Sequence, residues 1–135
     1  MKNQVAALIV SGRVEDRQQL ARILDSLSTN VFIVGTLAHA REVLQLQQIT
    51  IIFCDERLSD GTIRELVAYT KEQRSAAQFF VLLTTGEWPE YLEALGLGVD
   101  AIRYPVQPTD VELALIHAIR RISLAENPRR FAASA

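Results

Sequence analysis

The chain has 135 residues, 49% of them hydrophobic and 22% charged, which is the balance of one globular domain. Its net charge of -2 gives no electrostatic reason to expect nucleic acid or an anionic membrane as a partner. The single cysteine, Cys54, has no internal disulfide partner, and the apolar runs 5–10 and 49–54 are too short for a membrane span or a secretory signal. We therefore expect a cytoplasmic protein in which residues 1–125 form one domain and residues 126–135 a tail or linker stub.

Short apolar runs alternate along the chain with segments of helical periodicity. In chain order, the predicted strands cover residues 5–10, 31–34, 51–55, 79–83 and 99–104. The predicted helices cover residues 14–27, 37–44 with Ile49 as the furthest limit, 62–74 with a Thr62–Glu65 capping box, 89–95, and 109–125 with Thr109 or Asp110 as the cap. This alternation predicts an α/β fold, a flavodoxin-like, doubly wound, five-stranded parallel sheet of order 2-1-3-4-5 with five helices.

The third predicted strand runs straight into an acidic residue. Four apolar residues precede Asp55, and a polar turn follows it. A strand that is apolar on both faces fits the centre of a parallel sheet, where the ligand crevice lies outside the carboxyl ends of the strands. Asp55 is therefore a candidate functional carboxylate, although aspartate is also common as a turn cap. The predicted topology should bring Ser11, Thr84 and Tyr104 to the same edge.

Three short sequence motifs, each next to a predicted strand, occur together in a known family of domains. They are Phe53-Cys54-Asp55-Glu56-Arg57-Leu58-Ser59-Asp60-Gly61, the hydroxyl residue Thr84 after the fourth strand, and Gly98-Val99-Asp100 before the fifth. From residue 5 to about 122 the chain thereby resembles the receiver domains of two-component response regulators, with Ser59 at the usual proline. The resemblance implies a signal-transduction domain rather than an enzyme, with Asp55 at the phosphoacceptor position and a histidine kinase or another protein as partner.

The chain departs from this family where the family binds cations. Two acidic residues that hold Mg²⁺ in the family are replaced by Ser11-Gly12, and the family's Lys-Pro, whose peptide bond is typically cis, is replaced by Tyr104-Pro105. A carboxylate at about 4 Å contributes on the order of 4 kcal/mol to cation binding at an effective dielectric near 20, so Mg²⁺ binding should be weak or absent. Phosphoryl transfer needs these cations, so we expect a degenerate receiver with little or no phosphorylation. A phosphorylation-competent receiver would need substitute ligands, for which Glu15 and Asp16 are the candidates.

Arginine is the candidate replacement for the missing cations. Arg57 follows Asp55 by two residues, and Arg13 lies in the turn after the first strand. A guanidinium is always charged and pairs well with a carboxylate, but both side chains could equally point into solvent. A different alternative is a small anion-binding or nucleotide-binding flavodoxin-like domain that uses the Ser11-Gly12-Arg13 turn and the next helix N-terminus. One glycine in that turn is fewer than such loops usually contain.

The last predicted helix has apolar residues on two faces. Residues Val111, Ala114, Leu115, Ala118, Ile119 and Ile122 share one face and should pack on the sheet. The opposite face carries Leu113, Ile116, His117, Arg120 and Leu124. An apolar cluster on a second face predicts a contact site, and receivers commonly dimerise or bind partners through helix 4, strand 5 and helix 5. A homodimer through this surface is one interpretation; the other is that these residues cover a loop or the tail around Phe131.

Overall fold

Five parallel strands form the central sheet of the computed structural model, which describes residues 5–83, 96 and 99–126, with side chains as far as residue 121. The strands are β1 (Ala6–Val10), β2 (Asn30–Val34), β3 (Ile51–Asp55), β6 (Gln78–Leu83) and β7 (Asp100–Arg103). Their order is β2-β1-β3-β6-β7, and every neighbouring pair is parallel. The predicted order 2-1-3-4-5 is therefore confirmed, and each strand end lies within one residue of its predicted place.

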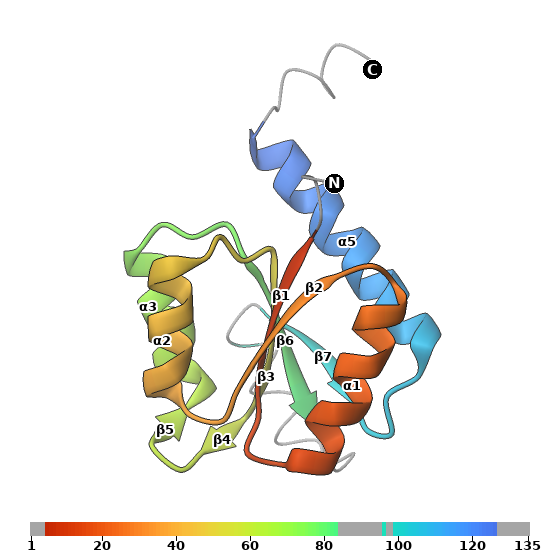
Figure 1. Ribbon diagram of the computed structural model, residues 1–135. Coiled ribbons are helices and arrows are strands. Elements are labelled where there is room, and N and C mark those ends of the chain that lie inside the picture. Colours follow the sequence, from red (N-terminus) through yellow and green to blue (C-terminus); the bar gives the residue numbers. More distant parts are fainter. Residues whose placement is uncertain (1–4, 84–95, 97–98, 127–135) are drawn as a thin grey trace.

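Helices cover both faces of this sheet. The described helices are α1 (Val14–Ser26), α2 (Leu37–Leu46), α3 (Ile63–Glu72) and α5 (Pro108–Glu126). Figure 1 shows α2 and α3 on one side of the sheet and α1 and α5 on the other. The helix predicted over residues 89–95 lies outside the described residues, as does the predicted tail after residue 126. Within the part of the chain that the structure describes, no helix has the length and apolarity needed to cross a bilayer.

The predicted cap of α5 is wrong, and α2 ends within its predicted range, short of Ile49. Helix α2 stops at Leu46 because Gln47 is extended, with φ -128° and ψ 146°, and Ile49 is buried in the connection to β3. Helix α5 begins at Pro108, before the predicted caps Thr109 and Asp110. Proline suits the first helical turn because its φ is already helical and its missing N–H would have no partner there. The predicted capping box of α3 is present.

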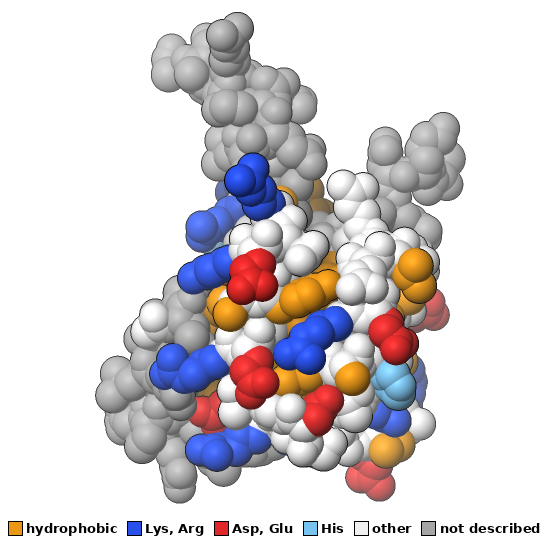
Figure 2. All heavy atoms as spheres, turned by 90° about the vertical axis from the view of Figure 1, so that its left-hand side faces the viewer, with side chains coloured by type: hydrophobic (Ala, Val, Ile, Leu, Met, Phe, Trp, Pro, Cys, Tyr) orange, Lys and Arg blue, Asp and Glu red, His pale blue; other side chains and the backbone are white. Residues whose placement is uncertain are grey.

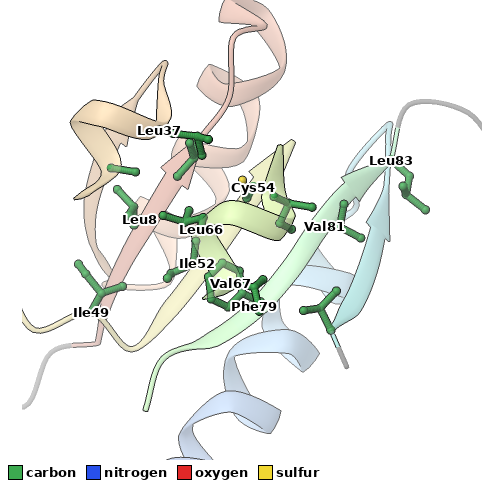
Figure 3. Packing of buried hydrophobic residues seen from close by; sticks show 14 residues of the cluster. Leu8, Leu37, Ile49, Ile52, Cys54, Leu66, Val67, Phe79, Val81 and Leu83 are labelled. Atoms are coloured by element: carbon green, nitrogen blue, oxygen red, sulfur yellow. The ribbon is translucent and has the colours of Figure 1, made fainter. Parts of the chain in front are cut away.

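The core consists of two apolar layers separated by the sheet. All five residues of β3 are buried, and successive side chains enter opposite layers. Ile52 and Cys54 belong to the layer under α2 and α3, shown in Figure 3, whereas Ile51 and Phe53 belong to the layer under α1 and α5. Burial on both faces explains why this segment is continuously apolar. Asp55 is the first acidic residue after it.

A short hairpin, which was not predicted, follows Asp55. Strands β4 (Arg57–Leu58) and β5 (Gly61–Thr62) pair antiparallel outside the main sheet. The Asp60 carboxylate accepts hydrogen bonds from the backbone N–H groups of Leu37 at 2.9 Å and Ala38 at 3.0 Å. These bonds lower the pKa of Asp60 and tie the hairpin to the start of α2. Gly61 has φ +151°, and a Cβ there would lie 2.5 Å from Leu37 Cδ1, so the close approach requires glycine.

Candidate functional site

Asp55 ends β3 beside the turn that follows β1. Val10 is in register with Cys54, so Ser11 and Asp55 leave neighbouring strands at the same edge of the sheet. The Ser11 N–H continues the ladder to β2 by donating to the Val34 carbonyl at 3.0 Å, which fixes the turn. Asp55 is 5% exposed and Ser11 is fully buried. A carboxylate this buried requires compensating donors.

The neighbouring turn supplies three donors to the Asp55 carboxylate. The Ser11 hydroxyl donates to Oδ2 at 2.9 Å, and the Gly12 N–H donates to the same oxygen at 3.0 Å. Arg13 Nη2 donates to Oδ1 at 2.7 Å and forms an ion pair there. Both carboxylate oxygens are therefore bonded, and the buried negative charge lies directly against a permanent positive charge.

Arg13 is itself held by several contacts. Its backbone N–H donates to the Ser11 hydroxyl at 3.1 Å, and Nη1 lies 3.4 Å from Asp16 Oδ2. Its guanidinium carbon lies 4.9 Å from the centre of the Tyr104 ring, within the range of a cation–π contact. The side chain is 32% exposed. Arg13 thus lies between two carboxylates with an aromatic ring against it.

Tyr104 follows β7 at the same edge of the sheet. Its N–H donates to the Leu83 carbonyl at 2.9 Å, and the Tyr104-Pro105 peptide bond is cis, as predicted. The hydroxyl oxygen is buried and has no hydrogen-bond partner in the described part of the chain. Burial raises the pKa of the Tyr104 hydroxyl far above its ordinary value, so the group is neutral.

The other predicted site residues have different surroundings. Arg57 is exposed on β4 and forms no ion pair or hydrogen bond with Asp55 in the described structure. Thr84 lies outside the described residues. Glu15 is exposed, and Asp16 faces Arg13. The structure therefore brings together Ser11, Gly12, Arg13, Asp55 and Tyr104, and does not add Arg57 to them.

Two supporting contacts were not predicted from the sequence. Arg17, in the first turn of α1, donates from Nη1 to the Ser11 carbonyl at 2.9 Å and so stabilises the turn after β1. Gly35 makes room for this contact, since a Cβ there would lie 3.2 Å from Arg17 Nη1. The Asp60 contact with α2 was the second omission. The side-chain oxygen at Asp60 and the free N–H groups expected at a helix start were the available signals for it.

The groups around Asp55 do not fit a divalent cation. Mg²⁺ takes oxygen ligands, usually from one or two carboxylates with water, but here the Arg13 guanidinium lies against Asp55 Oδ1 and Asp16. Among the described residues, no group of three or more histidine, cysteine, aspartate or glutamate side chains is arranged to hold a metal. Burial, with a smaller effect from the Asp55 charge, raises the pKa of the Cys54 thiol, so this cysteine is un-ionised and a poor ligand.

An open depression of about 380 Å³ lies over this site. It is lined by Gly12, Arg13, Asp55, Glu56, Arg57, Leu58, Ser59 and Leu82. A larger hollow of about 670 Å³ lies away from it, between β7 and α5. The Asp55 site is therefore accessible from outside on the side of the β4–β5 hairpin, although its carboxylate is already bonded.

The outer face of α5 carries exposed apolar residues. Leu113 is 64% exposed and Ile116 is 46% exposed, and His117 and Arg120 are exposed beside them. The His117 ring lies 3.9 Å from the Asp100 carboxylate of β7. Ile119 was predicted to pack on the sheet but is 42% exposed, whereas Val111, Ala114, Leu115 and Ala118 are buried as predicted. The side chains of Ile122 and Leu124 lie outside the described residues.

Charges of both signs are mixed on the face formed by α2 and α3. Figure 2 shows acidic and basic side chains there interspersed with small apolar patches. One basic group on these helices, Arg41, lies 5.8 Å from the centre of the Tyr69 ring. This face therefore presents no continuous field of one sign.

The fold is that of response regulator receiver domains. The sequence matches no protein-family model and no curated protein sequence. The structure is similar to the signal receiver domain of an HD domain-containing protein from Pseudomonas fluorescens, with a TM-score of 0.82, 17% identity, and coverage of 93% of this chain and 95% of that chain. It is also similar to a CheY-like receiver domain protein from Methanospirillum hungatei, with a TM-score of 0.77, 20% identity and coverage of 90% and 98%. A two-component response regulator from Clostridium difficile gives a TM-score of 0.78, 20% identity and coverage of 88% and 98%.

Proposed function

We propose that this chain is a receiver-like signalling domain in which Arg13 takes the place of the cations of a phosphoacceptor site. It then acts through protein contact, with little or no phosphorylation of Asp55 and no catalytic chemistry of its own. The observation that carries this proposal is the 2.7 Å ion pair between Arg13 Nη2 and Asp55 Oδ1, combined with the two donors on Oδ2. A charge supplied by the chain itself cannot dissociate as a metal does.

Phosphorylation of Asp55 would disturb every one of these contacts. Attack of an Asp55 oxygen on the phosphodonor would form an acyl phosphate as the donor's leaving group departs, and the carboxylate charge that the Arg13 guanidinium and the Ser11 and Gly12 donors bind would be lost to the phosphoryl oxygens. The incoming phosphoryl group would also need cations for its own oxygens. Arg13 is the adjacent candidate, but it is shared between Asp55 and Asp16. This competition supports weak or absent acceptance of phosphate.

The same contacts weigh against the two alternatives. A competent receiver would need Asp16 as a substitute metal ligand, and Asp16 lies against Arg13 instead. An anion-binding turn would need free donors, and the Ser11 hydroxyl and Gly12 N–H both donate to Asp55. The turn therefore already holds an anion, which is the side chain of its own chain.

Intact-mass measurement after incubation with acetyl phosphate and Mg²⁺ tests this function. We expect no gain of a phosphoryl group by the wild type, with an active receiver treated in parallel as the positive control. A rapid, Mg²⁺-dependent gain of one phosphoryl group that disappears in Asp55→Asn would show that the site is competent.

We further propose a second copy of the chain as the partner, bound through β7 and α5. Leu113 and Ile116 form the apolar centre of this surface. Asp100 and Asp110 line the hollow between β7 and α5 together with Arg103 and Arg120. Because an isologous interface places the same surface opposite itself, acidic and basic groups on one surface can pair across a two-fold axis. Association would then be constitutive and independent of a phosphodonor.

A further inference from the structure

We propose that Tyr104 is a positioning residue whose aromatic ring holds the Arg13 guanidinium on Asp55. This role rests on the proposed function, in which Arg13 supplies the positive charge of the site. In this role, Tyr104 determines how strongly the Arg13 guanidinium is held against Asp55. The sequence suggested only that a lysine is missing at Tyr104; the structure places an aromatic face there against a different cation.

The Tyr104 ring lies in direct contact range of the Arg13 guanidinium. The guanidinium carbon lies 4.9 Å from the ring centre, and a cation within about 6 Å of an aromatic face is attracted by its quadrupole. Asp55 and Asp16 bind the Nη atoms of the same group. The ring is fixed in turn by the end of the sheet, where the Tyr104 N–H donates to the Leu83 carbonyl. Arg13 is thus clamped between groups from β3, α1 and the end of β7.

The ring, rather than the hydroxyl, is the active part of Tyr104. Its hydroxyl oxygen is buried and lacks a partner among the described residues, which is unfavourable for a polar group. Phenylalanine would keep the aromatic face and remove this unpaired oxygen. Leucine would fill part of the space but provide no π face. The two substitutions therefore separate a cation–π role from mere packing.

A divalent cation could bind Asp55 Oδ1 only after displacing the Arg13 guanidinium from it. Arg13 either binds Asp55 or has released it, and only the released form leaves Asp55 free for a cation. The more the bound form is favoured, the lower the apparent affinity of Asp55 for the cation, in proportion. A substitution that favours the released form of Arg13 should raise the cation affinity of Asp55 in the same proportion. A cation–π contact at a partly exposed site changes such an equilibrium about two- to fivefold. The metal affinity of Asp55 therefore measures how strongly Arg13 is held on its carboxylate.

The test uses Mn²⁺ as the probe and the broadening of the Gly12 amide signal in NMR spectra as the readout. Tyr104→Leu should bind Mn²⁺ about two- to fivefold more tightly than the wild type, while Tyr104→Phe should match the wild type. Arg13→Gln should bind more tightly than either, because the competing charge is gone. Tyr104→Met, which is similar in size to leucine, more flexible and also without a π face, serves the same comparison should Tyr104→Leu fail to fold.

Tyr69→Leu is the matched control. It removes an aromatic ring that also lies against an arginine, Arg41, at 5.8 Å, but on the α2 and α3 side of the molecule. Its Mn²⁺ affinity should equal that of the wild type.

Two results would overturn the role of Tyr104. One is an unchanged affinity in Tyr104→Leu and Tyr104→Met while Arg13→Gln binds more tightly; Arg13 would then keep its function without Tyr104. The other is an equal rise in Tyr104→Phe and Tyr104→Leu, which would assign the effect to the hydroxyl. Failure of the proposed function looks different, because the wild type itself would then accept a phosphoryl group in Mg²⁺.

Discussion

Removal of the Arg13 side chain should destabilise the domain, because it leaves a buried carboxylate without its charge partner. The Asp55 side chain is 8% exposed, and the Arg13 side chain is 32% exposed. Breaking a fully buried ion pair from one side costs about 3–5 kcal/mol. Solvent reaches Arg13, and Asp55 retains the Ser11 and Gly12 donors, so we expect a smaller loss for Arg13→Ala, about 1–2 kcal/mol in the free energy of unfolding.

Urea denaturation followed by circular dichroism measures this loss, and a thermal scan should show a decrease in Tm of about 3–10 °C. Arg57→Ala is the matched control, since Arg57 is exposed on β4 and its removal should change stability by no more than about 0.5 kcal/mol. Equal stability of the two variants would refute the reasoning, because it would mean that the Arg13–Asp55 contact does not stabilise the folded state.

Three further outcomes are expected. Gly61→Ala should cost about 1–3 kcal/mol in urea denaturation, because φ is +151° and the new Cβ would overlap its neighbours, whereas Gly12→Ala, with no described atom within 4 Å of its Cβ, should be nearly neutral. Asp60→Asn should be less stable than the wild type at pH 7; because the folded-state pKa of Asp60 is lowered, the difference should shrink as the pH falls below about 4, and a pH-independent difference would contradict this. In sedimentation at high protein concentration the wild type should associate and Leu113→Glu with Ile116→Glu should not; a monomer in both cases removes the homodimer.

The strands of the sheet could be predicted from the sequence because burial on both faces leaves continuous apolar runs. Their order followed from the rules for parallel α/β sheets. The β4–β5 hairpin could not be found in this way. Its strands have two residues each, and the Asp60 contact with the start of α2, which the sequence does not show, ties it in place.

Helical periodicity placed most core residues correctly and failed at the margins. Val14 belongs to the apolar period of α1 but is 50% exposed, because it is the first residue of the helix. Ile119 lies at the rim of the buried stripe of α5, where the period alone does not decide between sheet and solvent. Periodicity defines the centre of a buried face better than its edges.

The sequence placed Asp55, Ser11 and Tyr104 at one edge of the sheet but did not choose between Arg13 and Arg57. That choice is made by tertiary structure. Arg57 lies on β4, where its side chain is exposed, whereas Arg13 occupies the N-cap position of α1, from which its guanidinium reaches Asp55. The contact of Tyr104 with Arg13 was also missed. An aromatic residue at the position of an expected lysine was its available signal.

The central claim is that Arg13 occupies Asp55 even when divalent cations are available. A crystal structure grown in millimolar Mg²⁺ tests it most directly, through the distance from Arg13 Nη2 to Asp55 Oδ1. We expect a distance close to 2.7 Å with the guanidinium against the carboxylate. A Mg²⁺ ion bound to Asp55, with Arg13 displaced beyond hydrogen-bond reach, would contradict it.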